Sequence, residues 1–219
     1  ATIMVAYLEQ KERTDEALLA ATAKADRLLN EIEEMVAMNC TAVDIAYSPN
    51  DLYRLKREGK KAIMLGIENG YAIGKDLSRV AHFRKRGVVY MTLCHNGNND
   101  ICGSARYNEE NLGVTPFGEQ VIQEMNRLGM MVDLSHSGER TFYETLDISS
   151  QPVVCSHSSS RALCDHPRNL TDDQLRAIAR KGGVVQVCLY SGFLRKERPA
   201  HILDAIEHLN HMVNVMGIE

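Results

Sequence analysis

Short apolar runs rich in β-branched residues alternate with longer stretches of helical spacing along the whole chain. The run at residues 3–8, for example, precedes residues 15–38, whose apolar positions step by three and four like one face of a helix. This alternation predicts a parallel sheet covered by helices. We expect further strands at 41–47, 62–67, 88–93, 130–134, 152–155 and 183–190, and helices at 49–58, 77–86, 116–128, 139–146, 171–180 and 202–216.

Two parallel architectures compete for this pattern. An open doubly wound sheet that binds dinucleotides carries a glycine-rich phosphate loop after its first strand. The segment Gly66-Ile67-Glu68-Asn69-Gly70 does not match that loop, and nothing else in the chain does. We therefore predict a TIM-type (β/α)8 barrel, as a single domain over residues 1–219.

Metal-ligating residue types stand where four of the predicted strands end. Glu68 ends one apolar run, and His95, His136 and His157 end three others. A β/α barrel builds its active site at the carboxyl ends of its strands, so these four side chains are expected to converge. Carboxylate oxygens and imidazole nitrogens are ligands that zinc prefers. One Glu and up to three His therefore predict a metal site at this face, in a barrel of the metal-dependent hydrolase kind.

The remaining histidines are expected to be structural. His208 and His211 are three apart on the last predicted helix and are interpreted, with His201, as part of a solvated face. His82 lies in a predicted helix and His166 in a loop.

Bulk composition excludes several classes of protein. The net charge is −4, and the one basic cluster, residues 84–86, lies at a predicted helix end where cations complement the helix dipole, so no nucleic-acid partner is expected. No apolar run approaches the roughly 18 residues of a membrane span. The six cysteines form no C-x-x-C pair, and we expect free thiols in a reducing compartment.

Five short segments form a pattern that covers nearly the whole chain. The most specific are Asp133-Leu134-Ser135-His136 and Ser156-His157-Ser158-Ser159, with the two histidines 21 positions apart. The others are Gly66-Ile67-Glu68-Asn69-Gly70, Thr92-Leu93-Cys94-His95-Asn96 and Arg168-Asn169-Leu170-Thr171-Asp172-Asp173. In these segments and in their order, the chain resembles the membrane (renal) dipeptidase family of zinc peptidases.

The resemblance implies a dipeptidase with two zinc ions per active site, at which a metal-activated hydroxide hydrolyses the peptide bond. Glu68 would bridge the two ions, with His136 and His157 as ligands of one of them. His95 would contact the substrate and steady the tetrahedral intermediate, which is its catalytic role. Arg168 would bind the terminal carboxylate of the dipeptide, and Tyr190 would line the substrate site.

Some features of the family's pattern are missing from this sequence. The family has an H-x-D pair at the end of its first barrel strand and an Asp at the end of its last strand. No H-x-D occurs here, and the sequence stops at Gly217-Ile218-Glu219, before that strand would start. Asn69 also stands where the family most often has Gly, and Tyr71 where it often has His. We expect the sequence to lack the first and last barrel strands, and the intact protein to be longer at both ends.

Three alternative functions stay open at this stage. A related amidohydrolase acting on a cyclic amide or lactam would keep the same metal site. A metal-free, inactive barrel fragment or binding module would also fit, because the H-x-D ligands are missing. The third, an α/β structural domain with no site, would leave the four strand-end residues unexplained. The family resemblance further suggests a homodimer, and the Lys- and Glu-rich helices suggest a bacterial homologue from the cytoplasm or periplasm.

Overall fold

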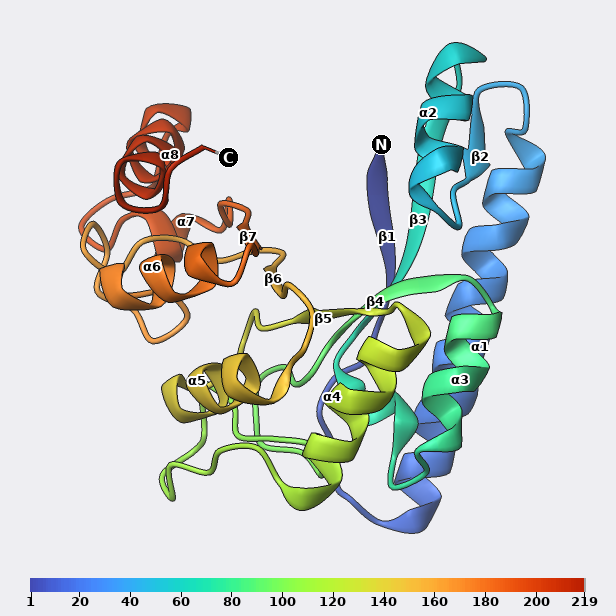
Figure 1. Cartoon of the computed structure of the whole chain (residues 1–219), viewed down its shortest axis with the longest axis horizontal. Coiled ribbons are helices and arrows are strands. Elements are labelled where there is room, and N and C mark those ends of the chain that lie inside the picture. The colour runs from blue at the N-terminus through green and yellow to red at the C-terminus, as the bar shows by residue number, and fades with distance from the viewer. Residues whose placement is uncertain (219) are drawn as a thin grey trace.

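The computed structural model describes residues 1–218, and in them a seven-stranded parallel sheet is covered by helices (Figure 1). The strands are β1 (Thr2–Tyr7), β2 (Val43–Ile45), β3 (Lys61–Glu68), β4 (Val88–Thr92), β5 (Met131–Asp133), β6 (Val154–Cys155) and β7 (Val184–Val185). The helices are α1 (Asp15–Met38), α2 (Pro49–Arg57), α3 (Ser78–Lys85), α4 (Pro116–Leu128), α5 (Glu139–Ile148), α6 (Asp172–Arg180), α7 (Ser191–Leu194) and α8 (Ile202–Met216), with a 3-10 turn at Gly70–Ile73.

The strands follow the order β1-β3-β4-β5-β6-β7, and β2 pairs with the start of β3. Every pairing in this sheet is parallel, so all carboxyl ends lie along the same edge. Figure 1 shows the sheet curling, with α1 running along β1 to β3 and with α6, α7 and α8 grouped at the other end. The predicted barrel class is confirmed in the form of a curled half-barrel.

Local sequence signals set several of the helix ends. Side chains of Thr14, Ser48, Thr115 and Thr171 each accept a hydrogen bond from a backbone N–H of the first turn that follows. Gly129 adopts the left-handed conformation that ends α4. The predicted bounds of 15–38, 116–128 and 202–216 are confirmed residue for residue.

The last strand differs from the prediction of residues 183–190. Regular pairing in β7 covers only Val184–Val185, against β6, and the chain then leaves the ladder. Gln186 still donates its N–H to the carbonyl of Cys155 and accepts from the N–H of Ser158. The apolar run therefore continues as an irregular segment that is bonded to the loop after β6.

The prediction of a solvated face for His208 and His211 is wrong for His208. His208 is 1% exposed and lies between the backbones of Ser160 and Leu194. His211 contacts the carboxylate of Asp172 on α6, at 2.7 Å. Both histidines dock α8 onto the rest of the chain, a role that helical spacing does not reveal.

The core lies between the sheet and the helices that cover it. Leu29 of α1, Phe83 of α3 and Met125 of α4 are fully buried against strand residues such as Leu65 and Met91. No helix within residues 1–218 combines the length and the apolar character that crossing a bilayer requires.

Candidate metal centre

Three segments far apart in sequence bring Glu68, His136 and His157 together. Glu68 is the last residue of β3, His136 follows the end of β5, and His157 follows the end of β6. Because the strands are parallel, these positions lie at one edge of the sheet. One ligand atom from each residue lies within 4.8 Å of the others. This is the convergence that the strand-end pattern predicts.

Oε1 of Glu68 is the point on which the histidines converge. It lies 3.4 Å from Nε2 of His157, 3.6 Å from Nε2 of His136 and 3.5 Å from Nε2 of His95. The Nε2 atoms of His136 and His157 are themselves 2.9 Å apart. One carboxylate and two imidazoles aimed at one point form a donor set that fits a divalent cation such as zinc.

His95 completes the cluster by stacking. Its ring lies 3.8 Å from that of His136, measured between centroids, and 4.8 Å from that of Tyr7 at the end of β1. The His95 side chain is mostly buried. The structure therefore brings His95 to the same centre as the three predicted ligands.

Two residues at the centre have backbone φ angles that are positive. His136 has a φ of 72°, in the left-handed region that few non-glycine residues adopt. Asn69, directly after Glu68, has a φ of 93°, which accounts for the glycine that the family pattern favours there. The Asn69 amide donates to the carbonyl of Leu8 and accepts from Tyr71 N and Asn99 Nδ2, so hydrogen bonds hold this backbone in place.

Burial and hydrogen bonding set the charges of the centre. Burial lowers the pKa of His136 to about 3, although a hydrogen bond to Glu68 acts in the opposite direction. Burial also lowers the pKa of His157. For Glu68, burial acts to raise the pKa, but hydrogen bonds from His136 and His95 outweigh it and hold the pKa below its usual range. At neutral pH the centre thus offers a carboxylate and neutral imidazoles, the forms that bind metal.

Arg168 lies behind this centre in a buried position. It is 3% exposed, and its Nη2 donates to the backbone carbonyl of His157 at 3.2 Å. Its guanidinium lies 5.4 Å from the ring centroid of Phe193. Within residues 1–218, Nε of Arg168 has no hydrogen-bond partner. A buried guanidinium with a free donor can receive an anionic group.

Tyr190 is less closely connected to the centre. It is 65% exposed, and its ring contacts Phe193 at 4.8 Å between centroids. It lies beyond the end of β7 as the N-cap of α7 rather than at the end of a long strand. Phe193 is the residue through which Tyr190 approaches Arg168.

Several residues of the site escape a search for strand-end ligands. Asp133 and Ser156 lie within the two most specific segments, yet only the folded chain brings their side chains together at 2.6 Å. Asn96, next to His95, places Oδ1 3.3 Å from Nδ1 of His136. A charged residue inside the apolar run 130–134 is the one signal that marks Asp133 in the sequence.

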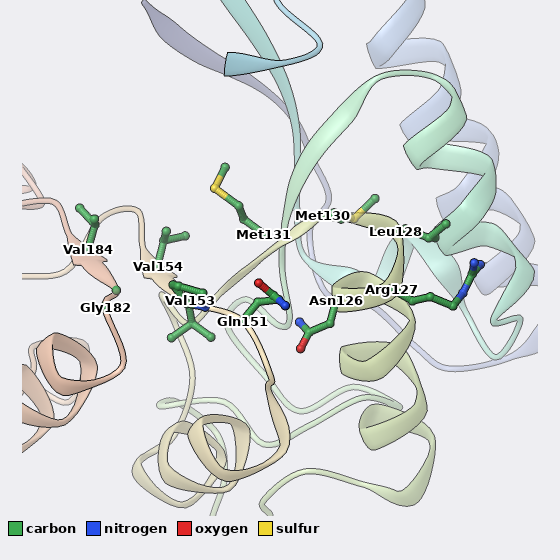
Figure 2. A pocket seen from close by; sticks show the side chains of 13 residues that line it. Asn126, Arg127, Leu128, Met130, Met131, Gln151, Val153, Val154, Gly182 and Val184 are labelled. Carbon is green, nitrogen blue, oxygen red and sulfur yellow. The ribbon is translucent and has the colours of Figure 1, made fainter. Parts of the chain in front are cut away.

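A pocket lies at the opposite edge of the sheet. It has a volume of about 740 Å³ and is lined by residues at the amino ends of β5, β6 and β7, including Met131, Val154 and Val184 (Figure 2). None of the residues that converge on Glu68 lines it. In β/α folds the chemistry lies at the carboxyl ends of the strands, so this pocket is separate from the metal centre.

Comparison with known proteins agrees with this geometry. The model of the membrane dipeptidase family, peptidase family M19, matches residues 1–219. Dipeptidase 3 of Mus musculus is 34% identical over 200 residues, which is 89% of this chain and 41% of that protein. An uncharacterized dipeptidase of Schizosaccharomyces pombe is 41% identical over 169 residues, 75% of this chain and 41% of that one. The chain thus spans about two fifths of the length of these curated relatives.

Solved structures share the fold. An amidohydrolase from Pseudomonas aeruginosa is 28% identical, with a TM-score of 0.84 over 99% of this chain and 69% of that one. A metallopeptidase from Rhodobacter sphaeroides, liganded with a phosphinate mimic of the dipeptide L-Ala-D-Ala, is 21% identical, with a TM-score of 0.88 over 98% of this chain and 70% of that one. With the family model matching from the first residue to the last, the chain belongs to the membrane dipeptidase family, peptidase family M19.

Proposed function

We propose that this protein is a zinc-dependent dipeptidase whose metal ligands are Glu68, His136 and His157. The observation that carries the proposal is the convergence of one carboxylate oxygen and two imidazole nitrogens beside a buried arginine. Bound zinc would supply a water of lowered pKa and would polarise the substrate carbonyl. The family membership and the dipeptide mimic bound by the Rhodobacter sphaeroides metallopeptidase favour a short peptide as the substrate.

The placement of Glu68 favours a bridging role between two zinc ions. Its closest contacts with His95, His136 and His157 all use Oε1. Oε2 is then available for a second cation, for which two further ligands would be needed.

The proposed roles of the other residues follow from their positions. His95, in contact with Oε1 of Glu68 and stacked on His136, is placed to hold the carbonyl oxygen as negative charge develops on it. Arg168 would bind the free carboxylate of the dipeptide through Nε, which has no hydrogen-bond partner within residues 1–218. Such a contact would favour dipeptides over longer peptides. Tyr190 would form an outer wall beyond Phe193.

The first test is the zinc content of protein purified without chelator, measured by elemental analysis. Two zinc ions per chain would support the bridged site, and one would indicate that Glu68, His136 and His157 hold a single ion. Glu68→Gln should lose the metal. If the protein holds no zinc even after zinc is added back, the proposal is wrong.

A second test concerns the substrate. Arg168→Ala should keep its zinc and lose about 10- to 100-fold in kcat/KM on dipeptides, the effect of removing a charge-assisted hydrogen bond in a buried site. Dipeptide amides, which lack the carboxylate, should be poor substrates for both proteins. Equal kcat/KM for wild type and Arg168→Ala on free dipeptides would reject the carboxylate-binding role.

The related amidohydrolase of Pseudomonas aeruginosa keeps a second substrate class under consideration. A panel that combines dipeptides with cyclic amides and lactams separates the two, because a cyclic amide has no free terminal carboxylate for Arg168. Faster turnover of the cyclic substrates would favour the amidohydrolase function.

A further inference from the structure

Asp133 is a buried carboxylate that the proposed reaction does not use. It is 0% exposed and accepts four hydrogen bonds. The hydroxyls of Thr92 and Ser156 each donate to Oδ2 at 2.6 Å. The backbone N–H groups of Ser135 and Ser156 donate to Oδ1 at 3.0 and 2.9 Å. All four donors are neutral, so the carboxylate is stabilised by hydrogen bonds rather than by an ion pair.

Ser156 connects this carboxylate to a proposed metal ligand. Its Oγ lies 2.6 Å from Oδ2 of Asp133 and 2.8 Å from Nδ1 of His157. A hydroxyl has one proton to donate, and a carboxylate can only accept. The hydroxyl of Ser156 therefore donates its proton to the hydrogen bond with Asp133, and Oγ accepts a hydrogen bond from Nδ1–H of His157.

This arrangement determines which nitrogen of His157 is free. With Nδ1 protonated and donating to Ser156, a neutral His157 has its lone pair on Nε2. That nitrogen is the one 3.4 Å from Oε1 of Glu68. A second hydrogen bond, from the backbone N–H of His157 to Oγ of Ser135 at 3.0 Å, also holds the backbone of His157 in place.

We infer that Asp133 is a positioning residue for the metal centre. It acts through the Ser156 hydroxyl to keep His157 protonated on Nδ1, with Nε2 directed at the metal. The effect on metal binding rests on the proposed function, whereas the hydrogen-bond chain is a property of the protein alone. Hydrogen bonds of this kind beyond the metal ligands hold the ligand ring in place and raise its basicity.

His136 is held by a separate and weaker contact. Its Nδ1 lies 3.3 Å from Oδ1 of Asn96, an amide oxygen that can accept a proton but bears no net charge. The two Nε2 atoms are 2.9 Å apart, so in the metal-free protein the proton of a neutral His136 lies on Nε2, toward the lone pair of His157 and toward Glu68. A bound cation would take the place of that proton. On the Nδ1 side, His157 has the stronger support, because there it alone is linked to a carboxylate.

The test compares three serine variants of the protein. Ser156→Ala removes the connecting hydroxyl, and Ser156→Thr keeps it. Ser158→Ala is the matched control, because Ser158 lies on the same loop and its Oγ has no hydrogen-bond partner within residues 1–218. Circular dichroism and thermal unfolding establish that each variant is folded. Asp133→Asn, if folded, should behave like Ser156→Ala.

The first readout is the tautomer of His157 in metal-free protein, from ¹⁵N chemical shifts of selectively labelled histidine. Wild type, Ser156→Thr and Ser158→Ala should carry the proton on Nδ1, and Ser156→Ala should lose that preference. A proton on Nε2 in the wild type would overturn the inference. This readout needs no bound metal, so it decides the hydrogen-bond chain even if the proposed function is wrong.

The second readout is zinc affinity, from competition with a chromogenic chelator. Ser156→Ala should weaken zinc binding by about 10- to 100-fold, the usual effect of removing such a supporting hydrogen bond. Ser156→Thr and Ser158→Ala should bind like wild type. Equal affinity in Ser156→Ala and Ser158→Ala would also overturn the inference. A wild type that binds no zinc would instead reject the proposed function.

Discussion

The two ends of the sheet are built differently. Strands β1, β3 and β4 have 6, 8 and 5 residues, whereas β5, β6 and β7 have 3, 2 and 2. Leu65 in β3 is fully buried, and Val184 in β7 is 55% exposed beside the pocket of Figure 2. We call β1 to β4 with α1 to α3 the first half, and β5 to β7 with α5 to α8 the second half.

Polar contacts replace regular pairing in the second half. The Asn169 amide donates to the carbonyls of Cys164 and Phe193, and Asp204 accepts from Arg195 and Arg198. The first half is specified by apolar periodicity, and the second by individual side chains that bind backbone groups in loops. Glu68 belongs to the first half, and His136 and His157 to the second, so the candidate metal centre lies where the two meet.

The largest expected difference is in core truncation. Leu65→Ala should lower the free energy of unfolding by about 2 to 5 kcal/mol, because it leaves a cavity in a packed core. Val184→Ala should cost less than about 0.5 kcal/mol, as an exposed site. Urea unfolding of both variants measures the contrast. Equal costs would mean that the two halves are packed alike.

Zinc should reduce the difference between the halves, because its proposed ligands come from both. At a concentration 100 times Kd, zinc should add about 2.7 kcal/mol to the free energy of unfolding. Hydrogen exchange of the β5, β6 and β7 amides should slow when zinc is added and recover with chelator. Glu68→Gln is the control, and an equal rise of its Tm with zinc would place the stabilising site elsewhere.

Acid should loosen the second half first, through His208. Its Nδ1 accepts from the N–H of Ser160 at 3.0 Å, and its Nε2 contacts the carbonyl of Leu194 at 3.2 Å. Burial lowers the pKa of His208 and outweighs the hydrogen bond with the Leu194 carbonyl, which acts to raise it. The unfolded histidine takes up a proton near pH 6.5 and the folded one resists it, so stability is full above that pH and falls below it.

Hydrogen exchange of α8 at pH 7.0 and pH 5.5 measures this effect. The α8 amides should exchange faster at the lower pH, after correction for the intrinsic rate, while those of β3 stay protected. His208→Gln should remove the pH dependence of α8. If α8 exchange in His208→Gln still depends on pH, another group is responsible for the acid sensitivity.

The smallest effect concerns helix caps. Thr171→Ala removes one arm of a capping box that Thr171 forms with Gln174 at the start of α6, at a cost of about 1 kcal/mol. Thr14→Ala removes the cap of α1 in the first half, with a similar local cost. If the halves unfold together, both variants should lower the urea midpoint equally. A loss of hydrogen-exchange protection confined to the α6 amides would show that the second half opens by itself.

The sequence revealed the long helices and the ends of the strands well. Helical spacing and caps predict the bounds of α1, α4 and α8, and Glu68, His95, His136 and His157 stand out because they follow apolar runs. It did not reveal the short extent of β7, the burial of His208 or the contact between Asp133 and Ser156. Those features depend on which loop backbones meet in space, which residue periodicity does not encode. Arg168 was found through the resemblance alone, because its burial depends on the same loops.

The left-handed backbone of His136 limits how this position can evolve. Among residues that ligate metals, His, Asp and Asn tolerate that conformation best, whereas a β-branched or bulky residue is strained there. Amino-acid substitutions at this position should therefore be confined to a narrow set of residues, even where another side chain could reach the same cation. His157, for which no such backbone restriction exists, is the proposed ligand at which a lineage could more readily exchange one donor type for another.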